Sequence, residues 1–321
     1  MTLIAVLKGG RSLERQVSLK SGARVEEALR ALGHEVVGID VGPNLVARLA
    51  EVGPELAFIA LHGRDGEDGT VQELLEVLQI PYTGSDAAAC VRASDKVLTK
   101  QALRDAGLPT ADFFFFSEGS FQSLGAGEAL SHVQARLGFP IVIKPAGQGS
   151  SLGIKFAANS TQLPTGLIAA FSYDRKVLLE RFIDGRDLAV GIVDGVGVGS
   201  GPQALPVVEA LPQPDAEDSG TAYDYEHRYE IGRTRFVCPA EIGDELSARA
   251  AELALATYAE LGCAGFARVD LMLERGSDEL FVLECNSIPG LTETSLLPQA
   301  ADVAGIGFEA LIERIVACAL A

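Results

Sequence analysis

The chain has 321 residues, which is long enough for two or three domains of roughly 100 to 150 residues. Hydrophobic residues make up 48% and charged residues 22%, as in globular proteins, and no stretch approaches the roughly 18 consecutive apolar residues of a membrane span. The net charge of −18 repels nucleic acid and anionic membrane surfaces, so neither is expected as a partner.

The first part of the chain predicts a small parallel α/β domain over residues 1–93. Apolar runs and helical spacing place its strands at residues 3–8, 36–40 and 56–61, and its helices at residues 14–32, 44–52 and 69–78. The Gly9–Gly10 turn does not match the GxGxxG pattern, which argues against a nicotinamide-dependent oxidoreductase. The opening segment lacks the basic leader of a secretory signal, and the five cysteines show no paired spacing. We therefore expect a cytoplasmic protein with structural thiols.

A second unit is expected to begin near residue 94 and to divide into a central lobe, residues 94–182, and a C-terminal lobe, residues 183–321. Ser94 is predicted to cap a helix that ends at Gly107. Further predicted strands are residues 139–144, 154–156, 177–182 and 188–193, and helices are predicted at residues 243–261 and about 307–320. Residues 211–237 are rich in Pro, Asp, Glu, Gly and Tyr, and so predict a long surface loop that is either functional or disordered.

Hard oxygen donors lie on two neighbouring predicted strands near the C-terminus. Arg268 and Asp270 are two residues apart on one strand, so their side chains share a face. Glu284 and Asn286 are two apart on the next strand, and a turn at residues 274–279 makes the two strands antiparallel neighbours. Carboxylate and amide oxygens suit Mg²⁺ held jointly with substrate phosphates, which indicates ATP chemistry. The plainer interpretation, polar residues at ordinary strand ends, stays open for either pair alone.

Residues 144–153 form a loop of small residues between two predicted strands. The loop combines glycines, which let a backbone approach phosphate closely, with Lys144 and the hydroxyls of Ser150 and Ser151. It lacks the Gly-Lys-Ser/Thr sequence of a Walker motif, so it predicts a phosphate-binding flap in a β-hairpin. A flexible hairpin turn is the alternative for the loop taken alone.

The ordered set of motifs resembles the ATP-grasp ligases, and specifically the D-alanine:D-alanine ligase family. The resemblance runs nearly end to end. The matching segments are residues 9–18, 61–63, 66–69, 81–85 and 94–96, the loop at Ser150 and Ser151, residues 223–225 with Tyr229, residues 268–270 and residues 284–296.

This resemblance implies an α/β protein with an ATP-grasp fold, preceded by a small Rossmann-like parallel α/β domain. It implies that ATP phosphorylates the carboxylate of a first D-alanine, and that the amine of a second D-alanine attacks the resulting D-alanyl phosphate. The product, D-alanyl-D-alanine, would supply peptidoglycan precursor synthesis. ATP and Mg²⁺ are the implied cofactors, with Mn²⁺ as a substitute and a monovalent cation such as K⁺ left open. A homodimer is the implied assembly.

The resemblance also assigns roles in metal and nucleotide binding. The implied metal ligands are Asp270, Glu284 and Asn286. The residues implied in ATP binding are Lys96, Lys144, Ser150, Ser151, Glu180, Arg181, Asp187 and Arg228. Three of them depart from the family pattern, because Arg181 and Arg228 stand where lysine is usual and Asp187 stands where glutamate is usual. The ATP contacts are therefore expected to differ.

The resemblance implies that two ionisable side chains, those of Glu14 and His62, lie beside the first D-alanine. Glu14 would pair with its ammonium group and connect through Ser150 to Tyr229. His62 would lie beside the same substrate, although a histidine with satisfied hydrogen bonds at a strand end is the ordinary interpretation of such a residue. Tyr229 goes with dipeptide formation in the family, and residues 211–237 would be a lid that excludes water from the acyl-phosphate.

The remaining implied roles concern the second D-alanine and the oxyanion. Arg268 and the backbone N–H of Gly290 would stabilise the tetrahedral oxyanion. Ser295 and the backbone of Leu296 would bind the second carboxylate at a helix start, where Ser295 could equally be a plain N-cap. Two alternatives stay open: a ligase that takes D-lactate or D-serine second, and a catalytically silent ATP-binding module.

Overall fold

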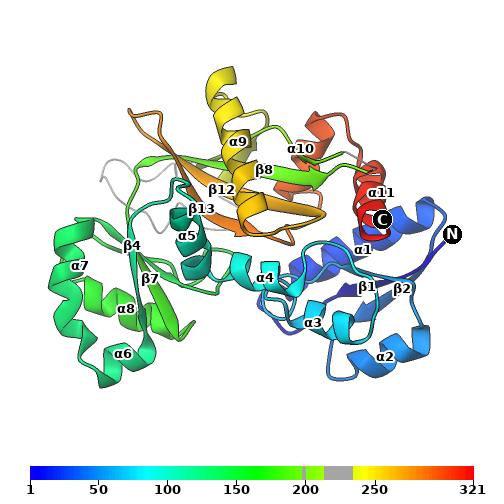
Figure 1. Ribbon diagram of the computed structural model, residues 1–321, viewed down its shortest axis with the longest axis horizontal. Helices are drawn as coiled ribbons and strands as arrows, with labels where there is room; N and C mark the ends of the chain where they lie inside the picture. Colours follow the sequence, from blue (N-terminus) through cyan, green and yellow to red (C-terminus); the bar gives the residue numbers. More distant parts are fainter. Residues whose placement is uncertain (197–199, 213–233) are drawn as a thin grey trace, which may run out of the picture.

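The computed structural model describes residues 1–196, 200–212 and 234–321. Within these ranges the strands form three sheets that follow one another along the chain, with helices packed against each (Figure 1). The N-terminal and central sheets lie at opposite ends of the molecule, and the largest sheet lies above and between them in this view. The predicted α/β class is confirmed.

The N-terminal sheet is parallel, as predicted. Its elements are β1 (Leu3–Lys8), α1 (Arg15–Ala31), β2 (Glu35–Asp40), α2 (Leu45–Val52), β3 (Leu56–Ile59) and α3 (Thr70–Val77). The strand order is β2-β1-β3, and α1 packs on the sheet through Val25 and Leu29. β3 ends at Ile59 rather than at residue 61, although the N–H of Ala60 still donates to the carbonyl of Leu7.

Two short helices, α4 (Ala87–Ser94) and α5 (Lys96–Asp105), connect this domain to the next sheet. The prediction that Ser94 caps α5 is wrong, because Ser94 is the last residue of α4. The carboxylate of Asp95 caps α5 instead, accepting hydrogen bonds of 2.9 and 3.2 Å from two N–H groups of the first turn. A carboxylate also faces the positive end of the helix dipole, so Asp95 is a better cap than the hydroxyl beside it.

The central sheet is antiparallel, with strand order β4-β7-β5-β6. Its elements are β4 (Phe113–Ser117), α6 (Glu118–Ser123), the 3-10 helix η1 (Ala126–Ala129), α7 (Leu130–Leu137), β5 (Ile141–Pro145), β6 (Lys155–Ala157), α8 (Leu163–Phe171) and β7 (Lys176–Arg181). Apolar residues such as Ile143 and Leu179 alternate onto the face that α7 and α8 cover. The opposite face carries Lys144 and Glu180 and packs against α5 through Val97.

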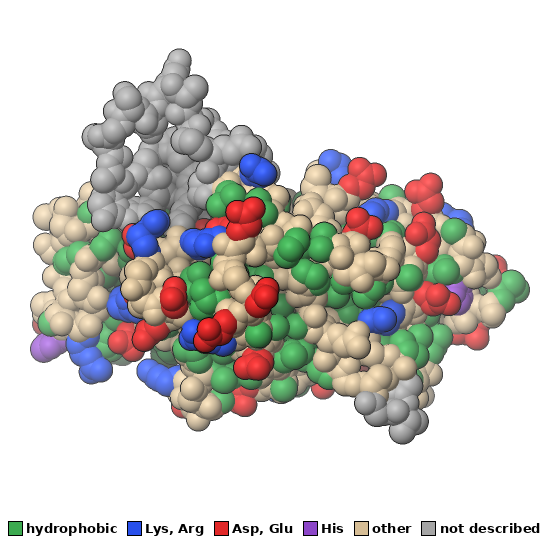
Figure 2. All heavy atoms as spheres, turned by 90° about the horizontal axis from the view of Figure 1, so that it is seen from above, with side chains coloured by type: hydrophobic (Ala, Val, Ile, Leu, Met, Phe, Trp, Pro, Cys, Tyr) green, Lys and Arg blue, Asp and Glu red, His purple; other side chains and the backbone are tan. Residues whose placement is uncertain are grey.

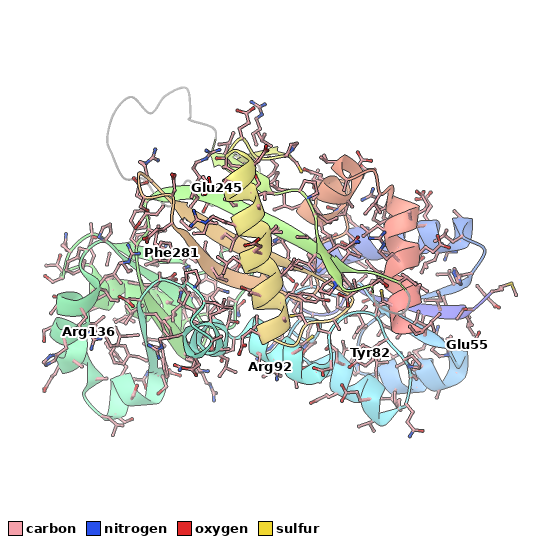
Figure 3. The ribbon with its side chains drawn as sticks, turned by 45° about the horizontal axis from the view of Figure 1, so that its top comes forward. Glu55, Tyr82, Arg92, Arg136, Glu245 and Phe281 are labelled. Atoms are coloured by element: carbon pink, nitrogen blue, oxygen red, sulfur yellow. The ribbon has the colours of Figure 1, made fainter. Side chains whose placement is uncertain are left out.

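The C-terminal sheet has the strand order β11-β10-β8-β12-β13, with β9 also paired to β8. Its elements are β8 (Gly185–Asp194), β9 (Pro202–Ala204), β10 (Val208–Pro212), β11 (Thr234–Val237), α9 (Asp244–Glu260), β12 (Phe266–Glu274), β13 (Leu280–Asn286), α10 (Leu296–Val303) and α11 (Phe308–Ala319). One face packs on α9, and the other packs on α10, α11 and the N-terminal core. Figure 3 shows Arg92 at the C-terminal end of α9, where its Nε donates to the carbonyl of Leu261 (3.0 Å) and joins α4 to α9.

The antiparallel pairing of β12 and β13 matches the predicted register. Arg268 lies opposite Asn286, and Asp270 lies opposite Glu284. A β-bulge follows directly after Asp270. The donors that the sequence placed on two strands therefore come together on one stretch of sheet.

The outer surface mixes charges of both signs. On the face shown in Figure 2, acidic and basic side chains are interspersed with apolar ones. Among the helices that the structure describes, none is both long and apolar enough to cross a membrane.

Candidate active site

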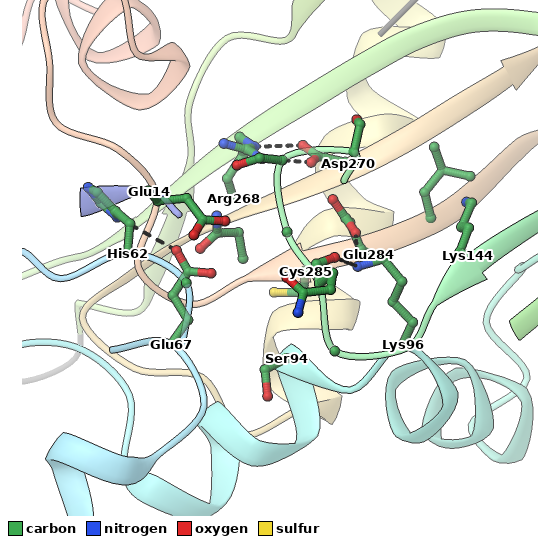
Figure 4. Close-up of a pocket in the computed structure, with 18 of the residues that line it drawn as sticks. Glu14, His62, Glu67, Ser94, Lys96, Lys144, Arg268, Asp270, Glu284 and Cys285 are labelled. Carbon is green, nitrogen blue, oxygen red and sulfur yellow. Dashed lines mark hydrogen bonds and ion pairs between the residues drawn. The ribbon is translucent and has the colours of Figure 1, made fainter. Parts of the chain in front are cut away.

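A cavity of about 1430 Å³ is lined by residues from the central and C-terminal sheets and from the loops and helix start beside the N-terminal sheet. Most of the site residues predicted from the sequence line it. They are Glu14, His62, Lys96, Lys144, Ser150, Ser151, Asp187, Arg268, Asp270, Glu284, Asn286, Gly290, Ser295 and Leu296. Figure 4 shows Glu14, His62 and Glu67 on one side, Lys96 and Lys144 on the other, and Arg268, Asp270 and Glu284 between them.

Strands β12 and β13 supply charged side chains that line the cavity. The guanidinium of Arg268 makes two hydrogen bonds to the carboxylate of Asp270, from Nε (2.7 Å) and from Nη2 (2.8 Å). The ammonium of Lys96, at the start of α5, lies 2.7 Å from Glu284 Oε2. The side-chain oxygen of Asn286 accepts from the N–H of Ile288 (2.9 Å) and keeps a second lone pair.

Burial and neighbouring cations set the charge of these carboxyls. Burial opposes the ionisation of Glu284, but the ammonium of Lys96, with smaller contributions from Lys144 and Arg268, outweighs it and holds the pKa at about 2. Burial raises the pKa of Asp270, and this effect exceeds the opposing attraction of Arg268. Each carboxylate therefore depends on a nearby cation for its charge.

The donor set fits a magnesium ion. Within the described ranges, no group of three or more His, Cys, Asp and Glu side chains is arranged to hold a metal. Here two carboxylates and one amide, those of Asp270, Glu284 and Asn286, line the cavity beside one another. Mg²⁺ commonly binds through one or two carboxylates, substrate phosphates and water, so three protein oxygens are sufficient.

Lys96 also joins β13 to the flap. Its Nζ donates to the carbonyl of Gln148 (2.8 Å) while it pairs with Glu284. A second anchor comes from Asp174, whose carboxylate accepts from the N–H of Gly147 (2.6 Å). The flap therefore lines the cavity with its backbone held at Gly147 and Gln148.

The two flap serines have an unusual backbone conformation. The φ angles of Ser150 and Ser151 are +51° and +58°, in the left-handed region that non-glycine residues seldom occupy. Such strain costs about 1 to 3 kcal/mol per residue and is found mainly at functional sites. Backbone N–H groups turned by left-handed residues form concave anion sites, which suits the predicted phosphate contact.

Glu180 does not line the cavity. Its carboxylate is 2% exposed and lies between two ammonium groups, 3.1 Å from Lys100 Nζ and 2.8 Å from Lys144 Nζ. Burial opposes its ionisation, but the two lysines outweigh this effect and lower the pKa of Glu180. Its assignment to ATP binding stays a prediction.

The three departures from the family pattern lie in different places. Arg181 also lies outside the cavity lining, because its Nη1 donates to Glu274 (3.0 Å) and its guanidinium stacks over Phe281. Asp187, on β8, lines the cavity. Arg228, the third, lies outside the described residues.

On the N-terminal side, Glu14 precedes α1 and extends its carboxylate into the cavity. Its side chain makes no capping hydrogen bond to α1. A Cβ atom at Gly63 would lie only 2.4 Å from Glu14 Oε2, so glycine is required there for the carboxylate to occupy this position. A carboxylate without a capping partner is suited to bind an ammonium group.

His62 is 4% exposed and has a partner at each ring nitrogen. Nδ1 lies 3.1 Å from the carbonyl oxygen of Ile288, and Nε2 lies 3.0 Å from Ser21 Oγ. Glu67 Oε1 lies 3.6 Å from Nδ1. His62 therefore has a partner at both ring nitrogens and also lines the cavity.

Ser295 and Gly290 lie in contact at the start of α10. Ser295 occupies the N-cap position, yet its side chain makes no capping hydrogen bond and Oγ accepts instead from the N–H of Thr292 (3.1 Å). A Cβ atom at Gly290 would lie 2.6 Å from Ser295 Oγ. The first N–H groups of α10, beginning at Leu296, are thus left for a ligand.

Family models match both parts of the chain. The model described as D-ala D-ala ligase C-terminus matches residues 102–317, and the model described as D-ala D-ala ligase N-terminus matches residues 45–85. The chain belongs to the D-alanine:D-alanine ligase family.

Individual relatives in this family match over nearly the whole chain. A D-alanine–D-alanine ligase of Syntrophotalea carbinolica is 42% identical over 98% of this chain and 95% of its own length. One of Desulforudis audaxviator is 44% identical over 98% of this chain and 97% of its own. The structure is similar to a crystal structure of the Bacillus anthracis ligase, with a TM-score of 0.84, 32% identity and coverage of 100% of this chain and 98% of that one. The ligase from the same organism complexed with ATP gives a TM-score of 0.81 at 31% identity.

Three residues around the ligase-family cavity were not singled out from the sequence. Glu67 lies in a segment that carried the resemblance, so its acidic side chain was a usable signal. Lys100 follows Lys96 by one helical turn, and this spacing could have indicated a shared face. Ser21 offered no local signal, because a small polar residue inside an amphipathic helix is ordinary. The predicted lid and Tyr229 fall mostly or wholly outside the described residues.

Proposed function

We propose that the protein is an ATP- and Mg²⁺-dependent ligase that joins two molecules of D-alanine into D-alanyl-D-alanine, for peptidoglycan precursor synthesis. The observation that carries the proposal is the β12–β13 register, which sets Arg268 and Asp270 against Asn286 and Glu284 beneath a phosphate-type flap. Membership of the ligase family over nearly the whole chain supports it.

In the first step, the carboxylate of one D-alanine attacks the terminal phosphorus of ATP, and ADP leaves. Phosphoryl transfer depends on positioning and on charge neutralisation more than on covalent help from the protein. Lys96, Lys144 and the N–H groups at Ser150 and Ser151 surround the space that the phosphates would occupy. Mg²⁺, when bound, would be held by Asp270, Glu284 and Asn286 and would neutralise phosphate oxygens.

In the second step, the amine of the second D-alanine attacks the acyl-phosphate carbonyl, and phosphate leaves once the tetrahedral intermediate collapses. Glu14 holds the ammonium of the first D-alanine. Arg268 and the N–H of Gly290 stabilise the oxyanion, and Arg268 has N–H groups for this besides the two that bind Asp270. Ser295 and the N–H of Leu296 bind the second carboxylate at the start of α10.

Other features of the proposal follow from the family. We propose that Glu180, Arg181, Asp187 and Arg228 contribute to the nucleotide site, and that Tyr229 lies on a lid at residues 211–237. We also propose three domains, residues 1–93, 94–182 and 183–321, a homodimer, and a cytoplasmic location where ATP is available. Light scattering coupled to size exclusion tests the dimer, and a monomer at working concentration would contradict it.

The alternatives are not favoured. A silent ATP-binding module would not need to keep Arg268, both metal carboxylates and the two flap-side lysines around one cavity. A ligase that prefers D-lactate or D-serine remains separable only by its product.

The test is phosphate release from ATP and Mg²⁺ with D-alanine, with L-alanine, and with a mixture of D-alanine and D-lactate, while product masses are recorded. Phosphate release with D-alanine and an equal amount of dipeptide is expected. Depsipeptide as the main product of the mixture would transfer the proposal to a D-lactate ligase, and ATP binding without turnover would contradict ligase activity.

A further inference from the structure

A buried serine on α1 contacts the two parts of the site that the D-alanine must meet. Ser21 has an exposed fraction of 0%. Its Oγ lies 3.0 Å from His62 Nε2 and accepts a hydrogen bond from the backbone N–H of Leu291 (3.2 Å). His62 Nδ1 in turn lies 3.1 Å from the carbonyl oxygen of Ile288. The four groups form a circuit that begins and ends on the loop around Gly290.

The hydrogen-bonding capacity of each group assigns a direction to the circuit. The carbonyl of Ile288 can only accept, so His62 carries its proton on Nδ1. In the neutral ring Nε2 is then an acceptor, and the hydroxyl of Ser21 donates to it. The same oxygen has a lone pair left for the N–H of Leu291. Every donor and acceptor in the circuit is used once, and only with this tautomer.

The circuit fixes the peptide groups on both sides of the proposed oxyanion donor. The carbonyl of Ile288 belongs to the peptide before Pro289, and the N–H of Leu291 belongs to the peptide after Gly290. The peptide between them carries the N–H of Gly290. With both neighbours held, this peptide has little freedom to rotate, and its N–H stays directed as folding placed it.

A second residue of α1 holds the same loop. Arg24, one turn after Ser21, donates from Nη1 to the carbonyl of Leu291 (3.1 Å), and its guanidinium stacks 3.6 Å over the ring of Phe308 on α11. The N–H of Leu291 thus donates to Ser21, and its carbonyl accepts from Arg24. Helix α1 therefore acts as a rigid mount for the loop.

We propose that Ser21 is a positioning residue for the ligase reaction: its hydroxyl fixes the Nδ1–H tautomer of His62 and aligns the N–H of Gly290. The inference rests on the proposed roles of His62 and Gly290 in that reaction. Ser21 does not touch the reacting atoms. It couples the pocket for the first D-alanine to the oxyanion donor through one hydroxyl.

The chain offers a matched control on the same helix. Ser18 lies one turn before Ser21, is equally buried, and also makes two hydrogen bonds, accepting from the N–H of Gly9 (2.8 Å) and donating to the carbonyl of Ala60 (2.7 Å). Its partners belong to the ends of β1 and β3 and not to the Gly290 loop. Ser18→Ala therefore removes a buried hydroxyl of the same kind without opening the circuit.

The kinetic test compares Ser21→Ala with Ser18→Ala and the wild type. Both variants are expected to lower the thermal midpoint by similar amounts. Only Ser21→Ala is expected to lower kcat for dipeptide formation, by about 10- to 100-fold, which is the usual cost of losing a group that orients a site residue. Equal kcat values in the two variants would overturn the proposal, whereas an inactive wild type would instead contradict the ligase function.

The spectroscopic test does not depend on activity. ¹⁵N NMR of histidine-labelled wild-type protein, with His62→Gln to assign the signal, is expected to show His62 protonated at Nδ1 and an Nε2 that accepts a hydrogen bond. Ser21→Ala is expected to shift the Nε2 signal, and Ser18→Ala to leave it in place. A wild-type His62 protonated at Nε2 would overturn the proposal by itself.

Discussion

The carboxylate of Glu180 shares its charge between two lysines that have different surroundings. Lys100 is fully buried, whereas Lys144 reaches the cavity. Burial lowers the pKa of Lys100, and the charge of Glu180 opposes that effect. If Lys144 turns to an ATP phosphate, Lys100 keeps Glu180 paired, so no buried charge is left alone.

Removing the deeper lysine tests this arrangement. Lys100→Met is expected to lower the free energy of unfolding by about 3 kcal/mol, since breaking one side of a buried ion pair is costly and Lys144 compensates only in part. The KM for ATP is expected to rise because Lys144 is then held by Glu180. Urea unfolding and steady-state kinetics measure the two effects.

Lys176 provides the control for this experiment. Its ammonium pairs with Asp95 near the surface, with about a third of the side chain exposed. Lys176→Met should therefore cost no more than about 1 kcal/mol. Equal losses of stability in the two variants would show that the Glu180 pair is no more important than a surface pair.

Among the structural elements, the flap between β5 and β6 combines strain with anchoring. Ser150 and Ser151 are left-handed, while Lys96 and Asp174 hold the backbone that precedes them. These two anchors hold the backbone in place, and such surrounding contacts allow the strained conformation to persist.

Substitutions at Ser151 separate backbone conformation from side-chain chemistry. Ser151→Val is expected to raise the KM for ATP about 10-fold, because a β-branched residue disfavours positive φ by roughly 1 to 2 kcal/mol and turns the N–H groups away. Ser151→Gly keeps the conformation and should change KM less than about threefold. ATP titrations in steady state measure both, and an equal rise in KM in the two variants, which both lack the hydroxyl, would assign the role to the hydroxyl instead.

Elements with a strong local pattern could be predicted from the sequence. The two-residue spacing of Arg268 with Asp270, and of Glu284 with Asn286, was enough to place them on one face. The Ser94 cap was wrong because two capping residues stand side by side, and local rules do not decide between them. The pairing of Glu180 with Lys100 joins residues far apart in sequence, so no local periodicity predicts it.

For the whole molecule, the central fact is that three parts of the chain line one cavity: the loops and helix start beside the N-terminal sheet, the central sheet with its flap, and the C-terminal sheet. Ligands that contact all of them should bind the folded state alone and stabilise it. A non-hydrolysable ATP analogue with Mg²⁺, at about 100 times its Kd, is expected to add about 2.7 kcal/mol to the free energy of unfolding. Chelation of the metal should remove most of that gain.

Two acidic residues of one hairpin test whether the β12–β13 carboxylates bind the metal that produces this stabilisation. Glu284→Gln is expected to lose most of the Mg²⁺-dependent rise in thermal midpoint. Glu279→Gln, exposed at the turn between β12 and β13, should keep it. The same ligand-induced rise in both variants would show that the metal binds elsewhere.

The most direct measurement for the account is the rate of D-alanyl-D-alanine formation, followed by mass, in Arg268→Ala and Arg275→Ala beside the wild type. Both arginines lie on the β12–β13 hairpin, but Arg275 is exposed and pairs with Asp184 outside the cavity. We predict that Arg268→Ala loses at least about 100-fold in kcat and that Arg275→Ala keeps wild-type turnover. Wild-type turnover in Arg268→Ala would contradict the assignment of the chemistry to this face of the sheet.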